Sequence, residues 1–317
     1  MKNNFKLART RDIGALFGDT FTYLKLNFKS FFGTILVFAG PFFLLNSLAS
    51  SFIFRISMGN MLGYSNPMQM LSDMALPFFL VILFSILGSA VYNTVVNEYM
   101  LIMDESPEGD KPGPSAIRQR FFSSFWRNLG TMFLVMLFSI IVYLLSALIL
   151  GVVIFLFKSM GVVGVLLMVL LFMFLFIIIL PVYMYMIVAI VFTGQRHKIG
   201  FFSAYGKVMS YLRGNFWITW VMSFLGGLTT YILIILAYLP VYVFTAVSFF
   251  TRMNLNNLDA VNNIQNEVPI CVTIITSVVS LLIVCISSIY LVMMNFHSAG
   301  LEEKATGKNL LDKIDSL

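Results

Sequence analysis

Charged residues are scarce in this chain of 317 residues: Asp, Glu, Lys and Arg make up 11%, while 59% of the residues are hydrophobic. A soluble domain of this length cannot cover its surface with so few water-compatible groups. The low charge therefore excludes a soluble globular fold and predicts a surface that faces lipid. The net charge of +6 gives no indication of a nucleic-acid partner, and we interpret it instead as a signal of membrane topology.

Cysteine and histidine are also scarce, with two residues of each. Cys271 and Cys285 lie on one expected helix, separated by about 21 Å at about 1.5 Å per residue, so they cannot pair with each other. His197 and His297 have no Cys or acidic residue at a spacing typical of metal sites. No Ser-His-Asp set, glycine-rich phosphate loop or HExxH motif is present. We therefore expect no metal, no cofactor and no enzymatic activity.

Long apolar runs dominate the rest of the chain. About 20 apolar residues are enough to cross a bilayer core roughly 30 Å thick. Six runs meet this length, at about 31–54, 77–100, 130–157, 162–193, 217–249 and 269–296. Pro41 lies inside the first run and predicts a kink there. The first run begins near position 30 and is long enough to span, so we expect no cleavable signal peptide.

Basic residues divide sharply between alternate loops. Seventeen of the 20 lie at the two termini and in the loops after the second and fourth runs, leaving Arg55, Lys158 and Arg252 on the other side. Short loops rich in Lys and Arg stay in the cytoplasm. We therefore predict six spans with both termini cytoplasmic, in the cytoplasmic (inner) membrane of a bacterium.

An internal repeat precedes alternate apolar runs. Phe17-Gly18-x-x-x-Thr22-Tyr23-Leu24-Lys25-x-Asn27-Phe28 returns as Tyr205-Gly206-x-x-x-Ser210-Tyr211-Leu212-Arg213-x-Asn215-Phe216, with a degraded middle copy, Phe125-Trp126-Arg127-Asn128-Leu129. The pattern predicts an all-α polytopic membrane protein with six transmembrane helices in three parallel repeats, each an interfacial amphipathic helix followed by a transmembrane hairpin. The single membrane domain, 1–317, then divides into repeats at about 10–104, 115–194 and 198–298, followed by a cytoplasmic tail at 299–317.

The amphipathic segments carry cations on their polar faces, and such helices lie in the headgroup plane. The candidate contacts with anionic lipid are Lys25, Lys29, Lys207 and Arg213. Plain anchoring of each hairpin is the alternative that needs no further function. Asn27, Asn128 and Asn215 recur at one register, and because Asn favours caps and turns, we expect each helix to pause there.

Ionisable residues are missing from mid-depth of the six runs, whereas pumps and proton relays usually place them there. Glu98 comes closest, and Asn93, Asn97 and Glu98 are the candidates for a polar cavity. An interfacial Glu at a helix end is the simpler alternative. Asn46 and Asn93 are candidates for hydrogen bonds between helices.

The loop at 55–76 contains five Met residues. Thioethers suit Cu(I), but no Cys or His joins the cluster, and Met also packs flexibly onto lipid or a partner.

Mitochondrial carriers also consist of three two-span repeats. Their Pro-x-acidic-x-x-basic signature is missing, since Phe42 and Phe43 follow Pro41, and Val241 and Tyr242 follow Pro240.

A resemblance to another group is carried by the entries from Ile13-Gly14 to Asn27-Phe28 and from Ile199-Gly200 to Asn215-Phe216, and by the tail from Phe296 to Lys304. In these segments the chain resembles bacterial six-span inner-membrane proteins. That group includes the membrane domain of glycerophosphoryl diester phosphodiesterases and YciC-like proteins. The resemblance concerns the membrane part only, so it does not imply phosphodiesterase activity.

Three functions follow as hypotheses. The first is a non-enzymatic integral inner-membrane protein that organises membrane lipid or assembles other membrane proteins. The second is a channel or transporter for an apolar or weakly polar solute, and the third is an intramembrane enzyme. A hydrophilic cavity in the structure would favour transport, whereas a dry, closed core with an exposed groove would favour the first hypothesis.

Overall fold

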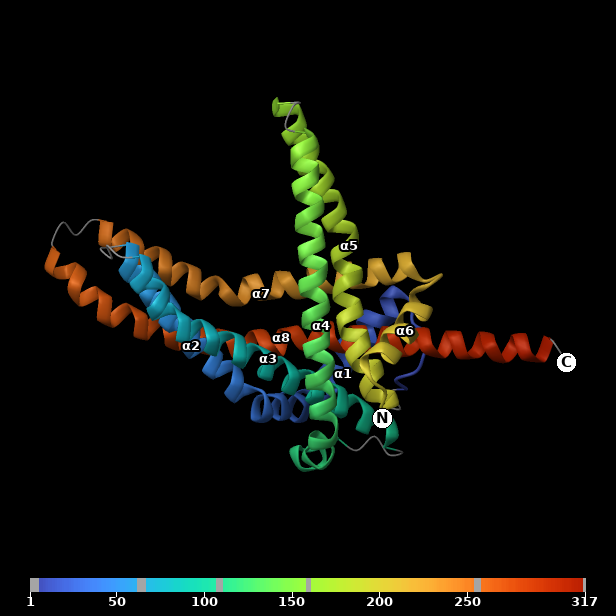
Figure 1. Ribbon diagram of the computed structural model, residues 1–317. Coiled ribbons are helices and arrows are strands. Elements are labelled where there is room, and N and C mark those ends of the chain that lie inside the picture. Colours follow the sequence, from blue (N-terminus) through green and yellow to red (C-terminus); the bar gives the residue numbers. More distant parts are fainter. Residues whose placement is uncertain (1–5, 62–66, 107–110, 158–160, 254–257, 316–317) are drawn as a thin grey trace.

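A computed structural model describes residues 6–61, 67–106, 111–157, 161–253 and 258–315 of the chain (Figure 1). The described part is all-helical. In chain order the helices are α1 (Ile13–Phe38), α2 (Gly40–Met61), α3 (Pro67–Glu105), α4 (Pro114–Phe157), α5 (Gly161–His197), α6 (Phe201–Leu212), α7 (Phe216–Met253) and α8 (Leu258–Asp315). Unbroken apolar sequence explains these lengths, because a helix satisfies every backbone polar group internally where no water is available.

In the part of the chain that the structure describes, five helices are long and apolar enough to cross a membrane, and the number rises to six if the bent pair of α1 and α2 forms one span. These helices contain five of the six predicted runs. The remaining run, 31–54, is divided at Ala39, where α1 and α2 meet with a bend of 54°. Pro41 lacks a backbone N–H and lies in the first turn of α2, in agreement with the predicted kink.

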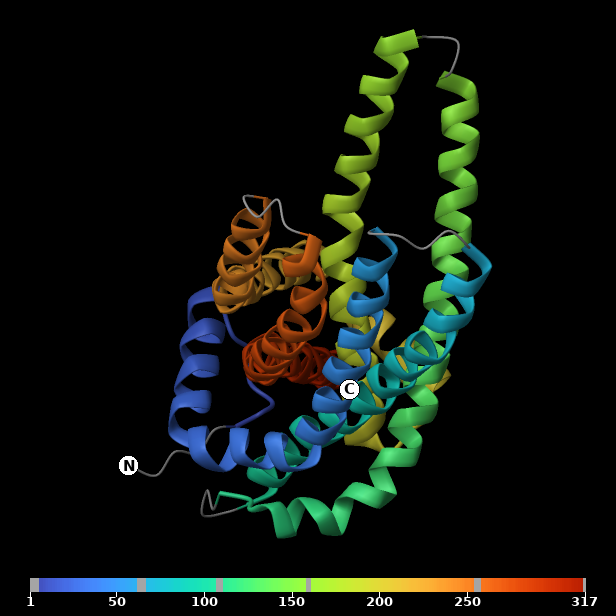
Figure 2. The same ribbon diagram turned by 90° about the vertical axis from the view of Figure 1, so that its left-hand side faces the viewer.

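Two helical hairpins run side by side, and a third diverges from them (Figures 1 and 2). The hairpin of α2 and α3 packs against the hairpin of α7 and α8 through α2 and α8. The α4–α5 hairpin extends away from this four-helix body. No residue in the most apolar stretch of α4 is buried inside the protein. The hairpins join near the α5 end at His197, where the largest buried side chains, including Tyr99, Tyr185 and Phe296, are found.

An N-terminal strap, residues 7–12, lies across this junction. Leu7 is buried, and its backbone N–H donates to Asp104 Oδ1 at the end of α3 over 2.9 Å. The Arg11 guanidinium stacks 4.4 Å from the ring centroid of Phe296 on α8. The strap therefore connects α3 to α8.

The three repeat segments are all helical, but their boundaries differ from the prediction. Only α6 is a separate short helix, whereas α1 and α4 continue without a break through Asn27 and Asn128. The predicted pause at those two residues is wrong, because the side chain of Asn27 donates within its helix to Tyr23 O and that of Asn128 turns inward to other helices. In the third repeat the chain does break, at Gly214, whose φ is +86°. The parallel threefold arrangement stays a prediction.

Candidate functional site

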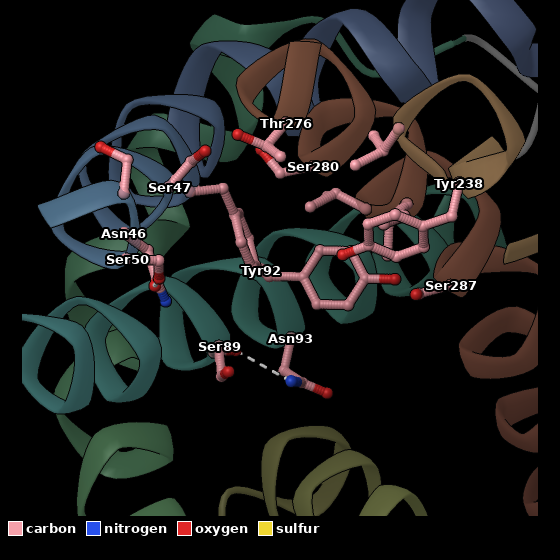
Figure 3. Close-up of a pocket in the computed structure, with 15 residues that line it drawn as sticks. Asn46, Ser47, Ser50, Ser89, Tyr92, Asn93, Tyr238, Thr276, Ser280 and Ser287 are labelled. Atoms are coloured by element: carbon pink, nitrogen blue, oxygen red, sulfur yellow. Dashed lines mark hydrogen bonds between the residues drawn. The ribbon is translucent and has the colours of Figure 1, made fainter. Parts of the chain in front are cut away.

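A cavity of about 680 Å³ lies between the two parallel hairpins (Figure 3). Its lining comes from α2 (Phe43, Asn46, Ser47, Ser50, Ser51), α3 (Ser89, Tyr92, Asn93), α7 (Tyr238, Val241) and α8 (Thr276, Ser280, Ile283, Val284, Ser287). Pockets that bind small molecules fall in the range of about 300 to 1,000 Å³. The cavity is therefore large enough for a small-molecule ligand.

The spacing of these residues explains how each helix forms one wall. On α8 the lining positions follow one another at intervals of three or four residues, from Thr276 through Ser280 to Ser287. The same intervals relate Phe43, Ser47 and Ser50 on α2. Residues three and four apart share one face of a helix. On α2 and α8, therefore, a stripe that includes several hydroxyls faces the cavity.

Hydrogen bonds fix part of this lining and cross from helix to helix. Asn46 Nδ2 donates to Ser85 Oγ on α3 at 2.6 Å, and the hydroxyls of Ser47 and Ser277 lie 3.1 Å apart between α2 and α8. Asn46 therefore bonds between helices as predicted. Asn93 instead donates to Ser89 O within α3 at 2.8 Å (Figure 3).

The chemistry of the lining is uniform. Eleven of the 15 residues carry a hydroxyl or a side-chain amide, and none is Asp, Glu, Lys, Arg or His. Phe43, Tyr92 and Tyr238 add aromatic surface. An ion inside such a cavity would lose its hydration without gaining an opposite charge, which is costly. An uncharged molecule with polar groups would find both donors and acceptors.

A second polar region, the junction network, is buried where the three hairpins meet. Its members are Thr94, Asn97 and Glu98 on α3, Ser124 and Asn128 on α4, Gln195 on α5 and Asn295 on α8, and each is at most 5% exposed. Glu98 Oε1 accepts hydrogen bonds from Ser124 Oγ at 2.5 Å and from Gln195 Nε2 at 2.7 Å. Among the described residues no cation forms an ion pair with Glu98, so neutral donors stabilise its carboxyl group.

Asn97 extends the junction network to α8. Its Oδ1 accepts from Asn295 Nδ2 at 2.8 Å, and its Nδ2 donates to Gln195 Oε1 at 3.1 Å. The three residues predicted for a polar cavity thus lie in two places. Asn93 lines the cavity, while Asn97 and Glu98 lie one turn further along α3 in the junction network. The two regions are neighbours on α3 but have different surroundings.

The four predicted lipid-contacting cations lie on two elements. Lys25 and Lys29 are exposed on α1, Lys207 is half-buried on α6, and exposed Arg213 follows α6 directly. Both helices pack against α8. Next to α6, Glu302 on α8 pairs with Arg196 at 3.0 Å and with His197 at 2.6 Å. Burial raises the pKa of the nearby Tyr211 hydroxyl, and the Glu302 charge raises it further.

Sequence analysis missed most of the cavity. Ser and Thr are small enough to occur in apolar runs without lowering their hydropathy much, so no residue of the α8 run was among the candidates for a polar cavity. The usable signal was the spacing of Thr276, Ser280 and Ser287, which are four and seven residues apart and so share one helix face. Among the described residues no group of three or more His, Cys, Asp or Glu could hold a metal ion. Most side chains of the Met-rich loop 55–76 lie outside the described residues.

Comparison of the chain with protein-family models, with curated proteins and with solved structures finds no match. The class of the protein therefore rests on its own helices: the described part is all-helical, with five or six helices long and apolar enough to cross a membrane, which is compatible with a multi-pass membrane protein. Its distinguishing feature is an uncharged, hydroxyl-lined cavity between two hairpins.

Proposed function

We propose that this protein is a non-enzymatic channel or transporter for a small, uncharged, weakly polar solute, which binds in the cavity between α2, α3, α7 and α8. One observation carries the proposal: a cavity of about 680 Å³ whose described lining combines hydroxyls, amides and aromatic rings and, among those described residues, includes no charged side chain. Hydrogen-bonding groups along a pathway select a solute by its polarity and exclude ions, whose charge the lining cannot balance.

Position within the helices supports the same function. Ser47, Ser89, Tyr238 and Ser280 all lie inside segments long and apolar enough to cross a membrane. Hydroxyls in a lipid-facing bundle are costly unless they have partners, and two of these have them: the hydroxyls of Ser47 and Ser277 lie 3.1 Å apart, and Ser280 Oγ donates to Ser277 O at 2.7 Å. Each hydroxyl oxygen keeps a further lone pair that a solute in the cavity can use.

Transport through the cavity is tested with purified protein in liposomes. We expect glycerol or a hexose to enter faster than into empty liposomes, and glutamate to enter no faster. Ser47→Phe and Ser280→Phe fill the cavity and should abolish the difference, whereas Ser146→Phe, on an exposed face of α4, should retain it. If the cavity variants transport solute as fast as the unmodified protein and Ser146→Phe, or if no protein raises solute entry above that of empty liposomes, the proposal is excluded.

Organisation of membrane lipid is a second candidate, favoured by the divergent α4–α5 hairpin. Its outer half exposes large apolar side chains, including Leu144, Leu148, Phe155, Leu170 and Phe174. Lipid chains are the occupant that fits a surface apolar on all sides. If this is the main role, protein incorporated into liposomes should change lipid order, and Leu144→Ser with Leu170→Ser should reduce that change while solute entry persists.

The location is part of the proposal. Seventeen of 20 basic residues fall on one side of a six-span arrangement, which supports a bacterial inner-membrane protein with cytoplasmic termini. Three parallel repeats and membership of the six-span group named above are proposed on the sequence motifs. Asn27 and Asn215 support the repeat, since each donates at 2.9 Å to the carbonyl of the Tyr four residues earlier.

A further inference from the structure

The segment that follows α3 is fastened to α1 by two hydrogen bonds. Lys111 Nζ donates to Leu26 O at 2.6 Å, and Ser30 Oγ donates to Pro112 O at 2.7 Å. Both contacts link residues more than 80 positions apart in the chain. They bring the Lys111 ammonium group to the part of α1 that carries Lys25 and Lys29.

Lys25, Lys29 and Lys111 together form what we call the α1 lysine patch. Lys25 and Lys29 are four residues apart, so they project from one face of α1. All three residues are exposed. Among the described residues, the four ion pairs of the protein involve none of these lysines. The patch therefore presents three cations without a paired carboxylate in that part of the chain.

Exposed aromatic side chains flank the patch on the same helix. Phe28 is 61% exposed and Phe21 is 44% exposed, and both lie within one turn of Lys25. Helices that lie at a membrane surface combine these features, because the rings enter the boundary of the acyl chains while the lysines reach the headgroups. An acidic protein segment would match the lysines but would leave the two rings uncovered.

We propose that the α1 lysine patch is a binding site for the phosphate group of an anionic lipid. The site is separate from the cavity, and it includes Lys111, which lies far from α1 in the sequence. Two lysines of α1 and one from the docked segment surround the phosphate, while Phe21 and Phe28 contact the acyl chains. Lys207 and Arg213, on and after α6, are not part of it.

Binding can be measured by native mass spectrometry of the full-length protein in neutral detergent. The probes are short-chain phosphatidylglycerol, short-chain phosphatidylcholine, inorganic phosphate and a phosphoserine peptide. We expect phosphatidylglycerol to bind most tightly, because it joins a net negative phosphate to acyl chains. Equal binding of inorganic phosphate, or tighter binding of the peptide, would overturn the lipid assignment.

Removal of the cations provides the decisive comparison. Each lysine near a headgroup contributes about fivefold in affinity, so K25Q/K29Q/K111Q should weaken phosphatidylglycerol binding on the order of 100-fold before screening. K25R/K29R/K111R should retain binding, and K207Q/R213Q should leave it unchanged. The difference should fade as ionic strength approaches 1 M.

Lys111 also holds the docked segment, so its loss could act through structure. K25Q/K29Q keeps the hydrogen bond from Lys111 to Leu26 O and should still weaken binding on the order of 25-fold. An unchanged affinity in K25Q/K29Q, or an equal loss in K207Q/R213Q, would refute the site. Neither result bears on the cavity, because solute entry is measured separately.

Discussion

Gln195, near the end of α5, holds Glu98 of α3 through a hydrogen bond of 2.7 Å from its Nε2 to Glu98 Oε1. The same side chain accepts from Asn128 Nδ2 of α4 at 2.5 Å and from Asn97 Nδ2 of α3 at 3.1 Å. One amide group on α5 thus bonds to both α3 and α4, at the point where the α4–α5 hairpin joins the rest of the protein. The hairpin has few other buried contacts along its apolar length.

Replacement of Gln195 by Leu should therefore destabilise the protein strongly. The change removes the hydrogen bonds that Gln195 makes with Glu98, Asn97 and Asn128, and each keeps only its other partner, Ser124, Asn295 or Thr94. Loss of hydrogen bonds in a buried network that includes a carboxyl group costs about 3 kcal/mol. The measurement is the free energy of unfolding in mixed micelles. Asn46→Ala, which removes the hydrogen bond to Ser85 and the one from Ser50, is the control and should cost about 0.6 kcal/mol for each bond. Equal losses in the two variants would contradict the special role of Gln195.

Gly300 supports a second prediction, because the N-terminal strap passes directly over it. A Cβ at residue 300 would lie 2.6 Å from Arg9 O and 3.3 Å from Arg9 C. Backbone atoms cannot yield as a flexible side chain does, so Gly300→Ala should displace the strap and lower the free energy of unfolding by about 1–3 kcal/mol. Hydrogen exchange of residues 7–12 should rise in the variant.

Gly307 on the same helix is the matched control for this prediction. Nothing lies within 4 Å of a Cβ built at Gly307, so Gly307→Ala should stabilise α8 by up to about 1 kcal/mol through helix propensity alone. If Gly300→Ala changes neither the free energy of unfolding nor the hydrogen exchange of residues 7–12, the close approach of Arg9 does not affect stability.

The sequence predicted the helical class and five of the six apolar runs because length and hydropathy alone define a span. It failed at Asn27 and Asn128, since the preference of Asn for caps is weak compared with a side chain that finds partners elsewhere. The cavity was only partly predictable. Asn93 stood out as polar, but contacts between α2 and α8 depend on residues about 230 positions apart, such as Ser47 and Ser277, and no single-helix pattern shows which stripes meet.

Gly214 supports a third prediction, at the break between α6 and α7. Its φ of +86° lies in the left-handed region, which costs residues with a Cβ about 1–2 kcal/mol. Gly214→Ala should therefore lower stability by that amount and shift the position of α6. Gly206 lies inside α6 with nothing within 4 Å of a Cβ built there, so Gly206→Ala should raise the free energy of unfolding by up to about 1 kcal/mol. The same sign in both variants would contradict the argument from conformation.

The bent pair of α1 and α2 decides the topology, and it leads to the last prediction. If the pair crosses the membrane once, the protein has six spans, and 17 basic residues lie on one side against three on the other. If the pair enters and returns, five spans remain, and the basic residues divide 9 against 11. Insertion in bacteria follows the bias of Lys and Arg in short loops, and only the first division provides such a bias. We therefore expect the bent pair to be a single, broken span.

Reporter fusions at residues 1, 110, 200 and 317 should accordingly report the cytoplasm, and fusions at 64 and 260 the opposite side. The fusion at 64 carries the most information, because a returning pair would leave it on the same side as residue 1. In that case the fusions at 110 and 200 would lie on the side of the membrane opposite residue 1. A cytoplasmic signal at 64 together with external signals at 110 and 200 would establish five spans. That pattern would also contradict the α1 lysine patch, because it places Lys25 and Lys111 on opposite sides of the membrane although Lys111 Nζ donates to Leu26 O at 2.6 Å.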